Sequence, residues 1–253
     1  MLLRSLKNID SFSIFANRLK EARQYFNYAI ILLLVFVLMA SSSFATKPSA
    51  NDFSPSIEIL KEVYLVDSAA SSIYRDLNAD DLNYFIFLEA YQGFVNYKRK
   101  GLIENSNVIT IIDFDKTSNE KRFFVVDLIA HKVLFNSYVA HGQKTGELEA
   151  KVFSNKVNSH QSSLGFYLTD NTYFGKHGLS LRLDGLEKGL NDNARDRNIV
   201  VHSADYVSSE YIDKNQRLGR SWGCPALPDE NYEEVIASIK DKSLLFIYSS
   251  AGN

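Results

Sequence analysis

The sequence predicts a mainly β domain, a β-sandwich or barrel with a few helices, preceded by a helical N-terminal segment. Short runs rich in Val, Ile and Phe recur from residue 108 onward, and polar turn residues separate them, as in all-β proteins. Before residue 103 the apolar residues repeat at helical spacing instead. The chain has no internal repeat and no low-complexity tract that would indicate another architecture.

The composition fits one medium-sized catalytic domain with additional segments. Apolar residues make up 45% and charged residues 23% of the 253 residues, which is enough for a sizeable buried core. The net charge of −2 is unevenly shared. Residues 1–28 hold five basic and two acidic residues, which leaves a charge of −5 for the rest. An acidic body argues against binding to nucleic acid, which requires a basic face.

Residues 1–45 have the parts of a secretory signal peptide. A basic stretch precedes twelve apolar residues at 29–40, and Ser43 and Ala45 fit the small positions of a cleavage site, so we expect cleavage after Ala45. A spanning helix needs about 20 apolar residues, and this run is shorter. The long basic stretch leaves an uncleaved signal anchor as the alternative. In both cases the body is exported to the periplasm or cell envelope, and it contacts the membrane only through a retained N-terminal segment.

Residues 46–56 are predicted to be a polar linker, and residues 57–103 a helical segment. The first helix has apolar residues at helical spacing at Ile57, Leu60 and Tyr64. The second has a longer apolar stripe, made of Tyr84, Phe87, Leu88, Tyr91, Phe94 and Val95. We expect Asn78 to cap this helix, Gly101 to follow its end, and the stripe to face the core.

Residues 107–250 are predicted to form the β domain. The predicted strands span residues 108–114, 122–128, 132–140, 166–169, 173–174, 179–183, 199–202 and 244–248. A polar hairpin loop is expected at 115–121. One amphipathic helix is predicted near residues 232–239, with Asp229 and Glu230 close to its start, where the helix dipole favours negative charge.

Cys224 is the only cysteine, which excludes an internal disulfide. In an exported protein a single Cys is an intermolecular bridge or a reactive thiol. A thiol nucleophile needs a base that ionises it, and His202, at the end of the apolar run 199–201, supplies that chemistry. Ser203 and Asp205 adjoin His202 and are placed to orient its ring. The alternative is a buried, inert Cys224 with His202 in the core.

The residues around Cys224 favour the reactive thiol. Gly219 and Gly223 give the backbone conformational freedom, and Pro225 biases Cys224 toward an extended conformation that suits presentation from a loop. The backbone N–H groups of Trp222, Gly223 and Cys224 are candidates for an oxyanion hole. These residues together predict a cysteine-dependent acyl-transfer enzyme.

The same stretch resembles the L,D-transpeptidase catalytic domain (YkuD-like) family, in which a His and a spacer precede Ser/Thr-His-Gly-Cys. Here eighteen residues separate His202 from Ser221-Trp-Gly-Cys224. The spacer is slightly longer than in the family, and Trp222 replaces the family's His. The string Arg-Ser-Trp-Gly-Cys-Pro-Ala-Leu-Pro resembles the murein L,D-transpeptidase catalytic domain branch, as do segments 140–142, 153–155, 162–166 and 181–189. The resemblance covers residues 107–248 and, more loosely, extends back to residue 57.

This resemblance implies peptidoglycan chemistry and a role for each residue. Cys224 is the expected nucleophile, His202 the general base, and Ser203 steadies the imidazole through its carbonyl or hydroxyl. The amides of Trp222, Gly223 and Cys224 are the expected oxyanion hole. The implied substrate is a stem tetrapeptide: the thiol attacks between the L-centre of the diamino acid and the terminal D-Ala, D-Ala leaves, and the acyl chain passes to an amine.

Other residues are candidates for substrate binding. They are Arg220, Ser221, Arg182 and His177. Arginine pairs bidentately with carboxylates, although a surface salt bridge is its commoner role, and His177 has a plain turn position as its alternative. Trp222 is expected to form an apolar wall on the acceptor path. No cofactor and no metal site are predicted, because the chain lacks short Cys/His spacings and residues 191–196 lack the spacing and Gly of a calcium loop.

Two other functional classes remain open at this point. The first is a hydrolase on the same fold, a murein amidase or carboxypeptidase. The second is a non-enzymatic envelope-binding domain in which Cys224 is inert. The expected partners are peptidoglycan stem peptides, and the sequence specifies neither the acceptor nor the oligomeric state.

Overall fold

The computed structural model describes residues 54–252 of the chain. Residues Lys61–Asn253 form one compact unit. The predicted signal peptide at 1–45 and the linker up to residue 53 lie outside the described residues. Helix α2 (Ser54–Leu77) begins earlier than predicted, so the last three residues of the predicted linker are helical.

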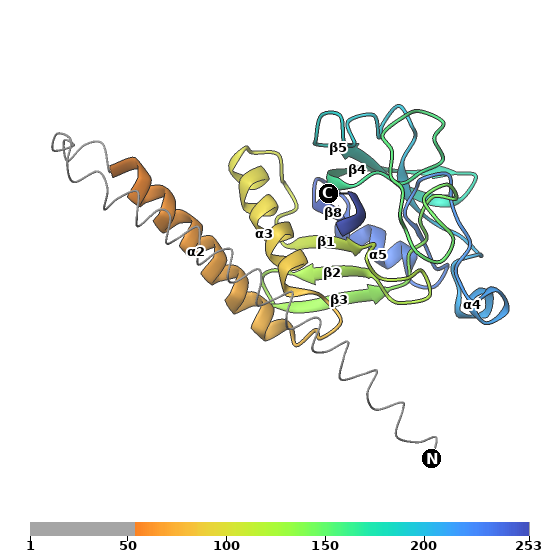
Figure 1. Cartoon of the computed structure of the whole chain (residues 1–253), viewed down its shortest axis with the longest axis horizontal. Helices are drawn as coiled ribbons and strands as arrows, with labels where there is room; N and C mark the ends of the chain where they lie inside the picture. The colour runs from red at the N-terminus through yellow and green to blue at the C-terminus, as the bar shows by residue number, and fades with distance from the viewer. Residues whose placement is uncertain (1–53, 253) are drawn as a thin grey trace, which may run out of the picture. The chain divides into compact units, whose positions relative to one another are not determined.

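An eight-stranded sheet forms the body of the unit (Figure 1). In chain order the strands are β1 (Val108–Asp113), β2 (Phe123–Asp127), β3 (Lys132–Ser137), β4 (Gly165–Gly175), β5 (Gly178–Gly185), β6 (Val200–Ser203), β7 (Ala226–Leu227) and β8 (Leu244–Tyr248). They lie in the order β3-β2-β1-β8-β4-β5-β6-β7. Neighbours are antiparallel except β1 with β8 and β6 with β7, which are parallel.

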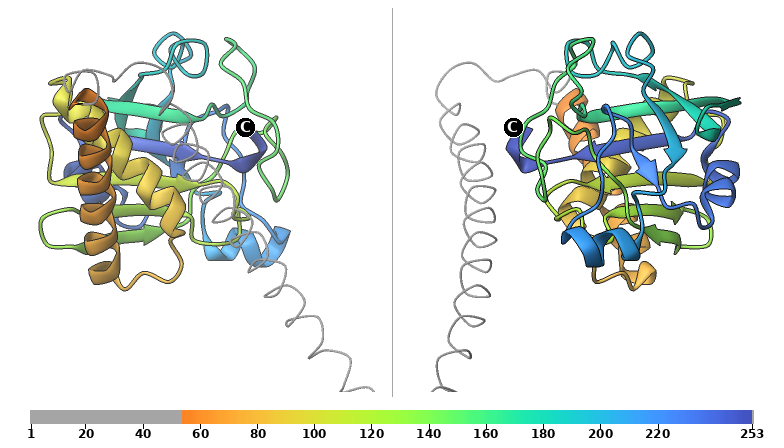
Figure 2. Two further views of the ribbon diagram at one scale, coloured as in Figure 1. Left: turned by 60° about the vertical axis from the view of Figure 1, so that its left-hand side comes forward. Right: turned by 90° about the vertical axis from the view of Figure 1, so that its right-hand side faces the viewer.

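The sheet curves until its two edges almost meet. Figure 2 shows strands β1–β3, β8 and β4–β5 as successive levels of this curved sheet. The backbone that continues from β3 reaches the opposite edge, where Ala140 forms an antiparallel bridge with Ala226 of β7. The result is a nearly closed barrel, which confirms the predicted mainly β architecture with a few helices.

Both faces of the sheet are buried, which explains the nearly continuous apolar runs of its strands. In β2, Phe123 and Val125 join an inner cluster that includes residues of helix α5 (Tyr232–Ile239). Phe124 and Val126 join an outer cluster with α2 and α3 (Tyr84–Arg99). This alternation follows the two-residue period of a strand.

The helices follow the predicted pattern with two differences. The aromatic stripe of α3 is largely buried, as expected, but its cap is Asn83, whose Oδ1 accepts a hydrogen bond from the N–H of Phe85 at 2.8 Å. The predicted cap, Asn78, is wrong: it follows the last residue of α2 with a positive φ of 48°. Helix α4 (Ser209–Asn215), capped by Ser208, was not predicted, because its polar sequence has little apolar periodicity.

The predicted strands are found with shifted ends. The runs predicted at 166–169 and 173–174 belong to one strand, β4, whose register against β5 shifts between Thr169 and Thr172. The polar residues at this irregularity interrupt the apolar pattern, so the sequence divides the strand in two. Strand β7 was not predicted, because its two residues are too short to show a period. A 3-10 helix, η2 (Ser250–Gly252), ends the described chain.

Among the helices of residues 54–252, none is both long and apolar enough to cross a bilayer.

We expect Gly93→Ala to destabilise the protein. A Cβ atom at Gly93 in α3 would lie 2.3 Å from ring atoms of Phe166. The ring of Phe166 is itself stacked on that of Phe246, with the ring centroids 4.3 Å apart. Alanine gains roughly 1 kcal/mol of helix propensity, but overpacking costs about 1–3 kcal/mol. Urea denaturation should therefore show a net loss of about 1 kcal/mol. Asn96→Ala, at an exposed position of the same helix, is the control, and a more stable Gly93→Ala would contradict this packing.

Candidate active site

His202 lies in strand β6 with 4% of its surface exposed. Its Nδ1 is 2.8 Å from the backbone carbonyl oxygen of Ser203. Because a carbonyl oxygen only accepts, Nδ1 carries the proton and donates it, and Nε2 has the free lone pair. The carbonyl of Ser203, rather than its hydroxyl, therefore fixes the tautomer of the imidazole. Asp205, the other predicted orienting group, has no hydrogen bond to this ring among the described residues.

The charge state of His202 follows from its surroundings. Burial lowers the pKa of His202, and the hydrogen bond to Ser203 opposes this effect. The ring of His177, from the turn between β4 and β5, stacks on His202 with centroids 4.6 Å apart and an angle of 29°. Positive charge on His177 or Lys176 lowers the pKa of His202 further. The imidazole is therefore neutral at pH 7, in the form that accepts a proton.

Cys224 reaches the same region through the pairing of β6 with β7. The register places His202 beside Ala226, two residues after Cys224. The thiol is partly buried, and its Sγ lies 3.6 Å from the carbonyl oxygen of Asn198. The backbone N–H of Val200 lowers the pKa of the thiol. Among the described residues no hydrogen bond joins Sγ to His202.

The loop before Cys224 is held by Ser221. Its Oγ accepts a hydrogen bond from the N–H of Gly223 at 3.0 Å and donates one to the carbonyl of Cys224 at 2.6 Å. Ser221 therefore shapes the loop, which differs from its predicted role in substrate binding. Gly223 has φ = 126°, and a Cβ atom there would lie 2.7 Å from the carbonyl oxygen of Gln161. Only glycine fits this position without strain.

These contacts change the predicted oxyanion hole. The N–H of Gly223 is already bonded to Ser221, so it does not face an incoming oxyanion as expected. In the described chain, no acceptor is hydrogen-bonded to the N–H groups of Trp222 and Cys224. These two amides are the ones that remain available to a developing negative charge.

Two distant segments fix the loop in place. The segment after β3 forms two backbone hydrogen bonds with Ser221. The N–H of Ser221 donates to the carbonyl of His141 at 3.0 Å, and the N–H of Gln143 donates to the carbonyl of Ser221 at 2.8 Å. Ser162 joins both sides, because its Oγ accepts from the N–H of Gly142 at 3.0 Å and donates to the carbonyl of Gly223 at 3.3 Å. The site is thus assembled from four stretches of chain, around residues 140–143, 159–163, 197–203 and 219–226.

His141 is a buried structural residue. Its Nδ1 accepts a hydrogen bond from Arg122 at 2.8 Å, so its Nε2 carries the proton and donates to the carbonyl of Gly146 at 3.2 Å. Arg122 is fully buried, and its guanidinium donates to the carbonyl of Val139. Burial, followed by the charge of Arg122, lowers the pKa of His141 to about 3. This imidazole therefore remains neutral and does not exchange protons near pH 7.

Trp222 lies next to Cys224 with 68% of its surface exposed. Its ring stacks on His160 with centroids 4.8 Å apart and an angle of 5°. Nε2 of Gln143 donates a hydrogen bond to Nδ1 of His160 at 2.8 Å, which fixes the imidazole beneath the indole. An exposed, supported aromatic face beside the thiol is consistent with the predicted apolar wall.

The two arginines predicted to bind carboxylates have protein partners instead. Arg220 forms an ion pair with Glu147 at 2.6 Å and donates to the carbonyls of Gln143 and Gly146. The guanidinium of Arg182 lies 4.3 Å from the ring centroid of Tyr173. The salt bridge that was the alternative for Arg220 is therefore present, and Arg182 has a cation–π partner.

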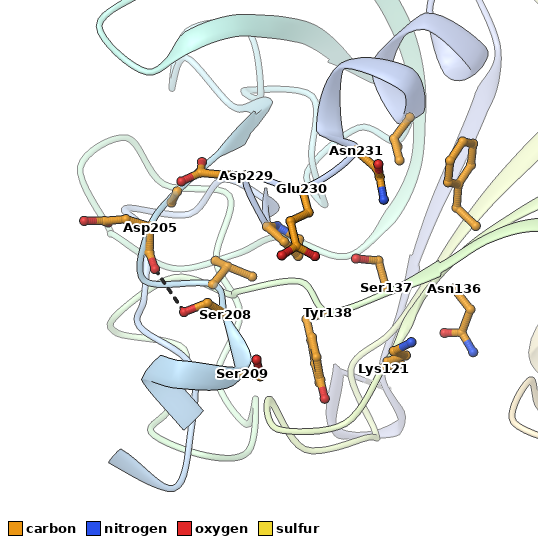
Figure 3. Close-up of a pocket in the computed structure, with 15 residues that line it drawn as sticks. Lys121, Asn136, Ser137, Tyr138, Asp205, Ser208, Ser209, Asp229, Glu230 and Asn231 are labelled. Atoms are coloured by element: carbon orange, nitrogen blue, oxygen red, sulfur yellow. Dashed lines mark hydrogen bonds between the residues drawn. The ribbon is translucent and has the colours of Figure 1, made fainter. Parts of the chain in front are cut away.

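A cavity of about 380 Å³ opens at the end of β6, next to the site (Figure 3). It is lined by the acidic residues Asp205, Asp229 and Glu230, and Figure 3 shows Tyr138 and Lys121 below them. Ala204, the residue that follows strand β6, also lines this cavity, whereas His202 and Cys224 do not.

Residues 54–252 contain no group of three or more His, Cys, Asp or Glu side chains that is arranged to hold a metal ion. Residues 191–196 form a polar turn with a structural role: Asn191 is buried and donates to the carbonyls of Leu164 and Phe166 at 2.9 Å each.

The nearly closed barrel, with His202 on β6 and Cys224 just before β7, defines a β-barrel domain with a candidate thiol site. A family model for the L,D-transpeptidase catalytic domain matches residues 78–248, more than half of the chain. The protein therefore belongs to the L,D-transpeptidase catalytic domain family, which confirms the resemblance seen in the sequence. No curated protein matches the chain.

Solved structures with a similar fold include three proteins at low identity. An L,D-transpeptidase from Mycobacterium smegmatis is 13% identical over 56% of this chain and 59% of its own, with a TM-score of 0.35. The helical cell shape determining protein Pgp2 from Campylobacter jejuni, as a K307A mutant, is 15% identical over 56% and 47%, with a TM-score of 0.38. An L,D-transpeptidase from Stackebrandtia nassauensis is 12% identical over 65% and 66%, with a TM-score of 0.34. The chain thus spans less than two thirds of each of these proteins.

Several residues at the site were not found from the sequence. Ser162, His141 and Arg122 support the Cys224 loop from distant positions, and Arg197 lies against Gly223. The resemblance covered the segments of Ser162 and His141 but gave neither residue a role. For Arg197 the sequence gives only a weak indication of a role at the site, namely its position five residues before His202.

We expect His141→Asn to weaken the acid dependence of stability. The pKa of His141 is about 3 in the folded protein and 6.5 in an unfolded chain. The unfolded state binds the extra proton, so this contribution is complete above pH 6.5 and falls as the pH drops toward 3. The Asn Oδ1 can still accept from Arg122, but the titration is lost. In urea denaturation between pH 6 and 4, the variant should lose about 1 kcal/mol less per pH unit than wild type.

The control is Ser72→Ala, which changes an exposed side chain on α2 that does not titrate. It should keep the wild-type dependence of unfolding free energy on pH. Equal slopes for His141→Asn and wild type would show that His141 is not the buried neutral group described above.

Proposed function

We propose that this protein is a peptidoglycan L,D-transpeptidase that uses Cys224 as its nucleophile. The observation that supports this best is the pairing of β6 with β7, which places a neutral His202, with its tautomer fixed by Ser203, on the strand next to the one that Cys224 leads into. Cys224 is partly exposed, and Trp222, two residues before it, has an exposed ring.

In the first half-reaction the thiol proton passes to Nε2 of His202, and the thiolate attacks the carbonyl carbon between the diamino acid and D-Ala. The carbonyl oxygen becomes an oxyanion that the amides of Trp222 and Cys224 stabilise. The C–N bond then breaks, and the leaving amine of D-Ala takes the proton from His202. A thioester between Cys224 and the stem remains.

In the second half-reaction an amine attacks the thioester. Its proton passes to Nε2 of His202, the C–S bond breaks, and the sulfur recovers a proton from the imidazolium. Transfer in preference to hydrolysis requires that the amine is positioned while water is restricted. The ring pair of Trp222 and His160 supplies an apolar surface for this purpose. We also propose export to the cell envelope through the segment at 1–45.

Cys224→Ala should abolish covalent labelling by a carbapenem and the exchange of terminal D-Ala on a muropeptide tetrapeptide. The reason is that both reactions form an acyl–sulfur bond, and the chain has no other cysteine. Intact-mass spectrometry checks the first and chromatography of defined muropeptides the second. Ser72→Ala, at an exposed position on α2, is the control. Labelling that survives the loss of Cys224 would refute the assignment.

His202→Gln should lower the rate of D-Ala exchange by about 10²–10⁴-fold, because the proton carrier is lost. The same change at His131, which is remote from β6, should leave the rate unaltered. Exchange measured with a saturating D-amino acid separates this effect from binding. A variant within threefold of wild type would remove His202 from the mechanism.

The same muropeptide assay distinguishes the alternatives. Incubation with a D-amino acid acceptor yields an exchanged tetrapeptide for a transferase. A product that is only the tripeptide would identify a hydrolase on this fold. An unchanged substrate, together with an unreactive thiol, would identify a binding domain.

A further inference from the structure

Three polar groups of the turn that enters β6 affect the thiol of Cys224. The carbonyl oxygen of Asn198 lies 3.6 Å from Sγ, and the backbone N–H of Val200 lowers the pKa of the thiol. Asn198 has a left-handed φ of 54°, which turns the backbone so that neighbouring groups converge. The third group is the guanidinium of Arg197, which belongs to the same turn.

Arg197 is held next to the thiol by neutral partners. Nη1 donates to Oγ of Ser163 at 2.9 Å, and Nη2 donates to Oγ of Ser159 at 3.3 Å and to the carbonyl of Gln161. A Cβ atom at Gly223, the residue before Cys224, would lie 3.1 Å from Nη2. The guanidinium is therefore packed against the backbone that presents the sulfur.

No carboxylate neutralises this cation in the described chain. The arginines that form ion pairs within residues 54–252 are Arg99, Arg195, Arg217 and Arg220. Arg197 is partly buried without a counter-ion, and burial lowers its pKa. A buried cation is costly unless an anion accompanies it. The acidic groups that interact with it are Tyr167 and Cys224.

Of these two, Cys224 is the group whose anion the proposed mechanism requires. Burial raises the pKa of Tyr167 well above its ordinary value, so this phenol remains neutral. Burial raises the pKa of the Cys224 thiol as well, while the N–H of Val200 and the charge of Arg197 lower it. His202 is neutral in the resting protein and supplies no positive charge. A thiolate at Cys224 would give Arg197 its missing partner.

We propose that Arg197 is the fixed positive charge that stabilises the thiolate of Cys224 after the thiol proton has passed to His202. This inference rests on the proposed role of Cys224 as the nucleophile. In many thiol enzymes a single imidazolium performs two tasks, because it carries the thiol proton and stabilises the thiolate. Here His202 carries the proton and Arg197 stabilises the thiolate. The other titratable groups around the sulfur and His202 are Tyr206, whose pKa is raised to about 12, and His177 and Lys176 from the β4–β5 turn.

The test is the pH dependence of alkylation by iodoacetamide, a neutral reagent, followed by intact-mass spectrometry. The single cysteine makes the readout specific. Arg197→Gln should raise the apparent pKa of the thiol by about one unit, and it should slow alkylation about tenfold at pH values below that pKa. Arg197→Lys, which keeps the charge, should titrate close to wild type.

Arg195→Gln is the matched control. It removes a cation two residues away, but one that Asp170 and Asp184 already neutralise at 2.7 and 2.6 Å. Its thiol titration should not change. A wild-type titration in Arg197→Gln would overturn the proposal. An equal shift in Arg197→Gln and Arg197→Lys would also overturn it, since the three hydrogen bonds, and not the charge, would then matter.

Two further outcomes separate this inference from other roles. If only iodoacetate, the anionic reagent, reacts more slowly in Arg197→Gln, Arg197 binds substrate carboxylates and the proposal fails. The assay needs no peptidoglycan substrate. A shifted thiol titration in a protein that never exchanges D-Ala would therefore support this inference and refute the proposed transpeptidase function.

Discussion

The parallel pairing of β6 with β7 is the constraint on which the rest of the site depends. It joins two segments that are far apart in the chain and places the residues beside His202 and after Cys224 in register. Strand β7 has only two residues, so Ala140, on its other edge, is needed to hold it. A slip of one residue would turn every side chain of the strand to the opposite face. Barrel closure and the assembly of the site are therefore one structural event.

Buried polar groups near the site are satisfied by neutral oxygen and nitrogen atoms. Arg122 donates to the backbone carbonyls of Lys116 and Val139, and Arg197 donates to two hydroxyls and a carbonyl. His141 and His202 are both kept neutral by burial. They differ in their free nitrogen: both nitrogens of His141 are engaged with the protein, whereas only Nδ1 of His202 is. The same burial produces a structural histidine in one case and a candidate base in the other.

The sequence was most informative where local pattern decides structure. The β-branched and aromatic runs predicted all strands except β7, and the rarity of cysteine pointed to Cys224. The sequence was least informative where long-range contacts decide. The hydroxyl of Ser221 and the amide of Gly223 satisfy each other, so residues that resemble binding groups in a linear reading serve the loop itself. Arg197 acquires its surroundings only when the 159–163 segment folds against it. Such roles depend on which groups are left without partners, and a sequence does not record this.

The stacked ring of Trp222 has a practical consequence. The chain has a single tryptophan, and it lies in the residues next to the sulfur with its outer face in solvent and its inner face on His160. Indole emission responds to the polarity around the ring and to a neighbouring imidazole. Excitation that selects tryptophan over the 14 tyrosines therefore reports on this one ring, two residues before Cys224, and binding beside it becomes visible without any attached dye.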